Sequence, residues 1–211
     1  TRKFCDSSLL DLKLEILKKL NFDEIILSSN DDNLKKYENE NIIFDKRNEY
    51  LCTNINSYKD LYKYHLSTIK NEVMFYTTPL TPFLNNSSID ILVSFWKNNP
   101  NYELVIFSKK IKNILENKRL DKKHLPLHHA GFIINIKTFE KYNYDISEIK
   151  NIYYIELTDL ETLIINNNTN FVLAESIYYR QFTNIKLIDN YMLNNNFKKT
   201  KLLDCTIRDS G

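Results

Sequence analysis

The chain has 211 residues, of which 43% are hydrophobic and 13% aromatic, so it can form one domain with a substantial core. Its net charge of +2, from 29 basic and 27 acidic residues, gives no electrostatic reason to expect nucleic acid or a membrane surface as a partner. No apolar run approaches the roughly 18 residues of a membrane-spanning helix, and no secretory signal is visible. Three widely separated cysteines without a CxxC pair favour a reducing cytoplasm.

The first predicted elements are a helix and a strand. Leucine and isoleucine residues recur at helical spacing from Leu9 to Leu20, and residues 6–8 supply side chains that can cap the helix start. The apolar run at residues 25–27 then predicts a strand buried on both faces. It ends abruptly in the polar tip Ser28–Asp32.

Short apolar runs then alternate with helical patterns along the rest of the chain. This order predicts an α/β fold, with a mostly parallel sheet covered by helices on both faces. Strands are predicted at 41–44, 73–76, 104–107, 131–136 and 153–157, and helices at 60–69, 89–96 after a cap at Ser88, from Thr138, and at 170–179. The charged residues 109–123 are predicted to form a flap or insertion.

The polar ends of the predicted strands are the first place to expect a site, because ligands of open parallel sheets bind outside the carboxyl ends of the strands. Any strand must also end in a polar turn, so one such tip is not specific. With only two glycines, Gly131 and Gly211, the chain can hold neither a GxGxxG nor a Walker A phosphate loop.

Five short motifs follow one another in a recognisable order. They are Ser28–Asp32, Arg47, Thr77–Leu80, His129–Gly131 and Ala174–Glu175. This series resembles the acylneuraminate cytidylyltransferase family, which makes CMP-activated sugars from CTP. The resemblance runs from about Arg2 to Phe182 and implies a Rossmann-like nucleotide-diphospho-sugar transferase fold for residues 1–182.

The resemblance also implies roles for individual residues. CTP would be the nucleotide, and CMP would pass to the hydroxyl of a sugar or sugar acid for surface glycan synthesis in the cytoplasm, in a homodimer. The nucleotide would be bound by Ser28, Asn30, Asp31, Arg47, Thr77 and Thr78, and the acceptor sugar by His129 and Gly131. No catalytic residue is assigned.

Two departures from the family pattern stand out. The family's N-terminal strand and its Gly-, Ser-, Arg- and Lys-rich loop have no counterpart here, apart from Arg2 and Lys3 as remnants. The two aspartates that hold Mg²⁺ in the family align with Ile164 and Asn166. Mg²⁺ prefers anionic oxygen ligands, so Asn166 would be a poor substitute and metal binding is in doubt. Glu161 is the carboxylate nearest to this position in the sequence.

The last ten residues, 202–211, resemble the first barrel strand of the metal-dependent aldolases related to hydroxymethylglutaryl-CoA lyase. Arg208 and Asp209 match that family's catalytic arginine and metal-binding aspartate. One strand cannot form a barrel, so neither residue is expected to take part in catalysis or metal binding in these 211 residues. Residues 183–211 are therefore predicted to be a linker and the start of an attached aldolase-like domain.

Three readings of the function remain open. The first is a nucleotidyltransferase of sugar activation. The second, favoured by Ile164 and Asn166, is a degenerate binding or scaffolding domain that serves an attached aldolase. The third is a glycosyltransferase, which ranks last because the sequence contains no Asp-x-Asp.

Overall fold

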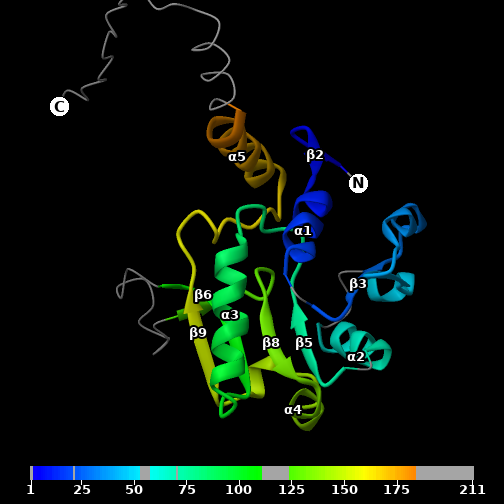
Figure 1. Cartoon of the computed structure of the whole chain (residues 1–211), viewed down its shortest axis with the longest axis vertical. Coiled ribbons are helices and arrows are strands. Elements are labelled where there is room, and N and C mark those ends of the chain that lie inside the picture. Colours follow the sequence, from blue (N-terminus) through cyan, green and yellow to red (C-terminus); the bar gives the residue numbers. More distant parts are fainter. Residues whose placement is uncertain (1, 21, 53–57, 70, 111–123, 184–211) are drawn as a thin grey trace, which may run out of the picture.

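The computed structural model describes residues 2–20, 22–52, 58–69, 71–110 and 124–183, which form an α/β fold (Figure 1). Its α-helices are α1 (Leu9–Lys18), α2 (Tyr58–Thr68), α3 (Asn86–Asn98), α4 (Ile136–Lys141) and α5 (Asn168–Tyr178). Its strands are β1 (Lys3–Phe4), β2 (Ser7–Ser8), β3 (Ile25–Ser29), β4 (Ile42–Lys46), β5 (Val73–Tyr76), β6 (Leu104–Lys110), β7 (His124–Pro126), β8 (Phe132–Asn135) and β9 (Ile152–Glu156). Most of the predicted flap, and the segment that resembles an aldolase strand, lie outside the described residues.

The larger sheet contains five strands in the order β5-β8-β6-β7, with β9 on β6. Both β5 and β6 pair antiparallel with β8, whereas β9 pairs parallel with β6. Strands β5, β6 and β9 therefore run in one direction, and β8 and the short β7 run in the other. The prediction of a mostly parallel sheet is thus only partly confirmed.

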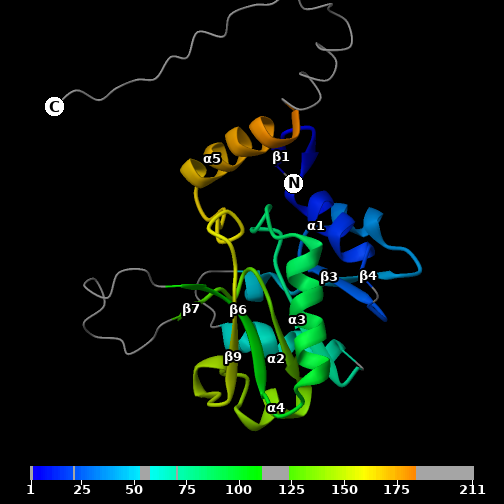
Figure 2. The same cartoon turned by 60° about the vertical axis from the view of Figure 1, so that its left-hand side comes forward.

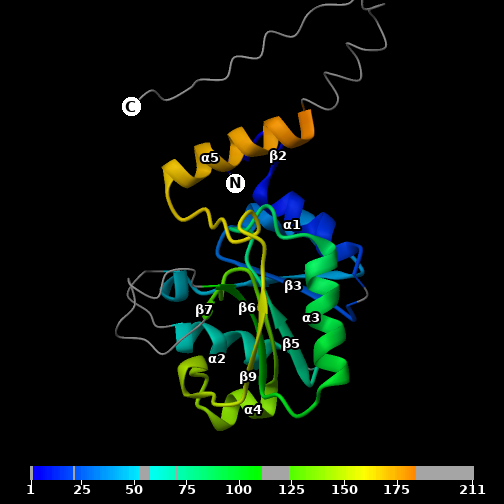
Figure 3. The same ribbon diagram turned by 90° about the vertical axis from the view of Figure 1, so that its left-hand side faces the viewer.

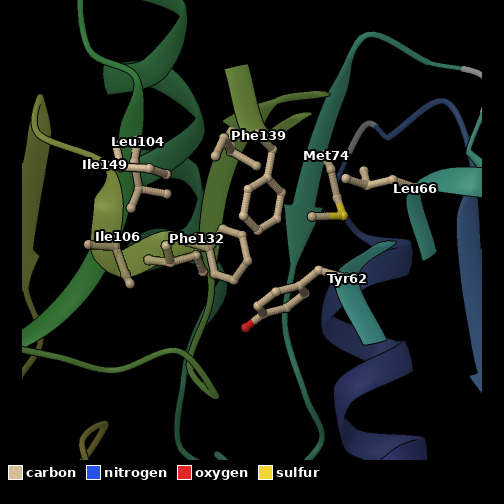
Figure 4. Close-up of a cluster of buried hydrophobic side chains, with 10 residues drawn as sticks. Tyr62, Leu66, Met74, Leu104, Ile106, Phe132, Phe139 and Ile149 are labelled. Carbon is tan, nitrogen blue, oxygen red and sulfur yellow. The ribbon is translucent and has the colours of Figure 1, made fainter. Parts of the chain in front are cut away.

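Helices cover both faces of this sheet, as predicted (Figures 2 and 3). Successive side chains of β6 point to opposite faces, and Leu104, Val105, Ile106 and Phe107 are all fully buried. Leu104 and Ile106 pack in a cluster with residues of α2 and α4, including Tyr62 and Phe139 (Figure 4). Val105 and Phe107 instead pack with residues of α3, among them Ile89 and Leu92.

Strands β3 and β4 form a separate parallel pair, in register from Ile25 opposite Ile42 to Ser29 opposite Lys46. The prediction that β3 is buried on both faces is wrong, because every residue of this strand is only half-buried. The cause is its position. Across the described part of the chain, β3 has a neighbouring strand on one edge only, and its other edge lines an open cavity.

The N-terminal residues pack against α5 at the end of the molecule (Figure 1). Phe4 is fully buried, and its ring makes an edge-to-face contact with Phe171 at 5.5 Å. The Arg2 guanidinium stacks over the same Phe171 ring at 3.6 Å and donates a hydrogen bond to Asn168. Arg2, predicted as a remnant of a phosphate-binding loop, is therefore held against α5.

Helix caps follow the prediction at α1 but not at α3. The Ser8 side chain accepts a hydrogen bond from Asp11 N and caps α1. Helix α3 begins earlier than predicted, because Asn85 is its N-cap and accepts from Ser88 N at 2.9 Å. None of the helices in the described ranges is long and apolar enough to span a membrane.

Candidate active site

A cavity of about 470 Å³ lies between β3 and β5. Helix α1 contributes one wall through Leu10, Lys13, Leu14 and Leu17. Four of the predicted nucleotide-binding residues line it. Ser28 lies at the end of β3, Arg47 follows β4, and Thr77 and Thr78 follow β5. The fold thus brings together residues that lie up to fifty positions apart in the sequence.

Two buried polar atoms of residues that line this cavity lack a partner among the described residues. Within the described residues, buried side-chain atoms without a hydrogen bond include Ser28 Oγ and Arg47 Nε. A buried polar group without a partner is costly, particularly when it carries charge. Ser28 Oγ could donate to a ligand oxygen, and Arg47 Nε requires an acceptor. An anionic or hydroxyl-rich ligand would satisfy both.

Lys13 is a cationic residue that the sequence interpretation missed. Its side chain is buried with 4% relative exposure, and Nζ donates to the carbonyl and hydroxyl oxygens of Thr81 at 3.2 and 3.1 Å. Burial lowers the pKa of Lys13 to about 7. The signal was present in the sequence, because Lys13 interrupts the apolar stripe of α1 between Leu10 and Leu17.

His65, from α2, also lines the cavity. Burial lowers its pKa to about 4, with a smaller contribution in the same direction from the nearby Arg47 charge. His65 is therefore neutral at pH 7. The positive charge at this cavity comes from Arg47, and from Lys13 when it is protonated.

Thr77 and Thr78 join the cavity to the segment predicted to bind the acceptor. Thr77 Oγ1 donates to Ala130 O at 2.8 Å, and Thr78 Oγ1 donates to His129 O at 3.1 Å. Each hydroxyl oxygen can still accept a hydrogen bond from a ligand. The two threonines thus hold the 129–131 turn beside β5.

His129 and Gly131 occupy this turn. His129 Nε2 lies 3.4 Å from the Tyr58 hydroxyl, and burial lowers the pKa of the imidazole. Gly131 has a φ of +145°, and a Cβ there would lie 2.8 Å from Tyr76 O. Only glycine permits this close approach to β5. The structure thus gives Gly131 a backbone role, while its predicted part in sugar binding stays a prediction.

Asn30 and Asp31 do not line the cavity. Asn30 is exposed, and its carbonyl accepts a hydrogen bond from Lys46 Nζ at 2.9 Å. Asp31 is the N-cap of the 3-10 helix η1 (Asp32–Tyr37), where it accepts from Asn33 N. These residues follow the tip of β3, where the chain turns away, so the structure gives them local roles.

The predicted metal position does not fit Mg²⁺. The side chain of Ile164 packs in the core, and Asn166 Oδ1 accepts hydrogen bonds from the side-chain amides of Asn167 and Asn170. Glu161 is buried, with its carboxylate bonded to Ser88, Thr158 and Asn85 N. Over the described ranges, no group of three or more His, Cys, Asp or Glu residues could hold a metal ion.

A second hollow, of about 550 Å³, lies at the outer side of β9. Its lining comes from β9, α3 and His124. It contains none of the residues that the sequence singled out for nucleotide, sugar or metal binding. Its lining carries one carboxylate, Glu156, whose Oε1 lies 3.8 Å from Lys110 Nζ. The cavity between β3 and β5 is therefore the stronger candidate site.

Comparison with known proteins supports the fold. No protein-family model and no curated protein matches the sequence. Solved structures do match, among them 4-diphosphocytidyl-2C-methyl-D-erythritol synthase from Anaerococcus prevotii, with 13% identity and a TM-score of 0.63 over 84% of this chain and 88% of that one. The fold is that of these proteins.

Two further solved structures are similar to this chain in fold. CMP:2-keto-3-deoxy-manno-octonic acid synthetase, determined in complex with CTP, has a TM-score of 0.63 at 7% identity, over 86% of this chain and 91% of that chain. The bifunctional IspDF from Campylobacter jejuni has a TM-score of 0.53 at 15% identity, over 72% of this chain and 42% of that chain. At these identities the likeness concerns the fold. It agrees with the Rossmann-like nucleotide-diphospho-sugar transferase fold predicted from the motifs.

Proposed function

We propose that this chain is a CTP-dependent cytidylyltransferase, which transfers CMP to the hydroxyl of a small sugar or sugar acid. The observation that carries the proposal is the placement of two cationic side chains, the half-buried Arg47 and the buried Lys13, at the cavity where Ser28, Thr77 and Thr78 also meet. Support comes also from two structures with this fold, a 4-diphosphocytidyl-2C-methyl-D-erythritol synthase and a CMP:2-keto-3-deoxy-manno-octonic acid synthetase in complex with CTP.

The proposed reaction is nucleotidyl transfer. The acceptor hydroxyl attacks the α-phosphorus of CTP, the new P–O bond forms, and the bond to pyrophosphate breaks. Arg47 would stabilise the negative charge that develops on the phosphates, because preorganised donors in a buried site act strongly on such charge. Phosphate binding beside Lys13 would favour its protonated form and add a second cation.

The hydroxyl-bearing residues would orient the substrates. Ser28 Oγ has no partner among the described residues and could donate to the nucleotide. The Thr77 hydroxyl oxygen could accept from a ribose hydroxyl, as could the second lone pair of Thr78 Oγ1, which already accepts from Leu80 N. His129 stands next to them on the acceptor side. Since Ile164 and Asn166 do not fit Mg²⁺, no step of this proposal passes through a metal at that position.

The finer features of the proposal come from the motif resemblance. The product would be a CMP-activated sugar used in surface glycan synthesis in the cytoplasm, and the enzyme would be a homodimer linked to an aldolase-like domain. The replaced metal ligands favour the second candidate, a non-catalytic scaffold with the same fold. CTP binding distinguishes the two, because only the enzyme requires it.

Isothermal titration calorimetry of the whole protein with CTP tests the proposal. We expect CTP to bind at least ten-fold more tightly than GTP, and Arg47→Gln to weaken CTP binding at least ten-fold, since it removes a charge-assisted contact. Lys97→Gln on α3 removes the same charge from an exposed position and should leave the affinity unchanged. No binding of CTP, or equal binding of CTP and GTP, would favour the scaffold.

A further inference from the structure

Strand β9 lies at an edge of the five-stranded sheet (Figure 1), and within the described residues it pairs only with β6. The hollow of about 550 Å³ surrounds its other edge. Tyr153 stacks on Phe95 of α3, and Tyr154 stacks on His124. Because neighbouring residues of a strand point to opposite faces, α3 and His124 flank the two faces of β9. Ile91 of α3, which also lines the hollow, is 58% exposed.

Alternate backbone groups of β9 point away from β6. Leu157 N, directly after the strand, donates to Ser108 O of β6. In a parallel ladder, every second residue directs its N–H and C=O groups toward the partner strand, and the residues between them direct theirs the opposite way. The backbone groups of Ile152, Tyr154 and Glu156 therefore point into the hollow.

This edge lacks the features that usually keep strand edges from pairing. Exposed edges are commonly protected by charged side chains or proline. Residues 151–155 contain neither, and the four apolar residues among them are only half-buried. Charges occur only at the two ends of this stretch, at Lys150 and Glu156, which are both exposed. The edge is therefore suited to pair with a further strand.

The two end charges distinguish the ways in which a second copy could pair. Parallel pairing of two β9 strands in register would place like charges side by side, which is unfavourable. Antiparallel pairing centred on Tyr153 instead places Lys150 of each copy opposite Glu156 of the other. The same register sets the outward backbone groups of Ile152 opposite those of Tyr154, as an antiparallel ladder requires.

We propose that the edge of β9 is a self-association surface, at which two copies of this chain pair their β9 strands antiparallel about a two-fold axis at Tyr153. The surface is self-complementary in charge and in backbone direction, as a two-fold interface must be. The two five-stranded sheets become continuous, and the α3 helices flank the joined strands. This inference gives the homodimer of the proposed function a surface, but it rests on the strand edge and not on nucleotide binding.

Charge reversal tests the register. By sedimentation equilibrium of the whole protein at low salt we expect a dimer, and Lys150→Glu or Glu156→Lys should each raise its dissociation constant about ten-fold, since like charges then face each other at two places. Glu156 Oε1 also lies 3.8 Å from Lys110 Nζ, so Lys150→Glu is the cleaner single change. The double variant restores opposite charges and should return to within about three-fold of the unchanged protein.

Lys35→Glu is the matched control, because it makes the same charge change at an exposed position of η1, beside the β3–β4 pair. It should leave the dissociation constant unchanged. A protein that stays monomeric at about 100 μM would overturn the proposal, since that concentration far exceeds the dissociation constants of stable dimers. A dimer that Lys150→Glu does not weaken, or that the double variant does not restore, would also overturn it.

Amide hydrogen exchange locates the interface independently. In the dimer, exchange at Ile152, Tyr154 and Glu156 should be at least ~10-fold slower than in protein diluted below the dissociation constant, because new ladder hydrogen bonds form. The amide of Tyr153, directed at β6, is the internal control and should be slow in both. Fast exchange at Ile152 and Tyr154 in the dimer would contradict the inference. Neither measurement involves CTP, so failure of nucleotide binding would leave their results unaffected.

Discussion

Lys13 is a residue whose chemistry burial changes strongly. Burial lowers its pKa from 10.5 to about 7. Between these values the unfolded chain binds more protons than the folded one, so the free energy of unfolding rises with pH across this window. Lys13→Met should remove this dependence. Relative to Lys13→Met, the protein with Lys13 should gain roughly 2 kcal/mol in its free energy of unfolding from pH 7 to pH 9.

Urea denaturation at several pH values measures this effect. The two proteins have the same remaining ionisable groups, so the difference between their pH curves isolates Lys13. Parallel curves would contradict the assignment. CTP affinity of the same variant gives a second result: at pH 6, where Lys13 is mostly charged, Lys13→Met should bind CTP more weakly by about ten-fold or more.

At Gly131 the backbone geometry determines which residue type can be accommodated. Its φ of +145° is strained for any other residue, and an added Cβ would meet Tyr76 O at 2.8 Å and the Phe75 ring at 2.9 Å. Gly131→Ala should lower the free energy of unfolding by about 2–4 kcal/mol. Urea denaturation tests this, with Ser94→Ala, an exposed change on α3, as the control. A loss below about 0.5 kcal/mol would contradict it.

Individual site residues were predictable to different degrees. Ser28, Arg47, Thr77 and Thr78 were singled out through the motif resemblance, and the structure brings all four to one cavity. Their part in nucleotide binding stays a prediction. Asn30 and Asp31 belong to the same motif, but the chain turns before them, which local sequence does not specify. Lys13 was missed because a lysine within a helix is usually solvent-exposed.

At the scale of elements, α3 provides a direct test of capping. Asn85 accepts a hydrogen bond from Ser88 N and is the N-cap, whereas the sequence pattern favoured Ser88. Asn85→Ala should cost about 1 kcal/mol of stability. Ser87→Ala, an exposed change in the same helical turn, should cost less than about 0.5 kcal/mol. Equal effects in thermal or urea unfolding would show that Asn85 does not cap the helix.

Element positions were largely predictable because periodicity is local. The strand at 73–76 is found where it was predicted, and the helix after Ser8 starts at Leu9. The direction of each strand was not predictable, because an apolar run does not indicate whether the strand lies parallel or antiparallel to its neighbours. Strand β8, for example, is antiparallel to both β5 and β6. The β1–β2 hairpin was missed because strands of two residues carry no period.

At the scale of the whole molecule, the central feature is the cavity that separates two sheets. A β3–β4 pair and a five-stranded sheet face each other across it, and α1 covers one side. No local pattern reveals such a cavity, because it depends on which strands remain unpaired. The polar end of this cavity collects the candidate nucleotide-binding side chains.

Mapping CTP by NMR chemical shifts on the whole protein tests the central claim most directly. The account predicts that CTP at saturating concentration shifts the backbone amides of Ser28, Arg47, Thr77 and Thr78, with little change along the outer side of β9. Shifts confined to the β9 hollow around Phe95 and Tyr153, or no shifts with CTP at all, would contradict it.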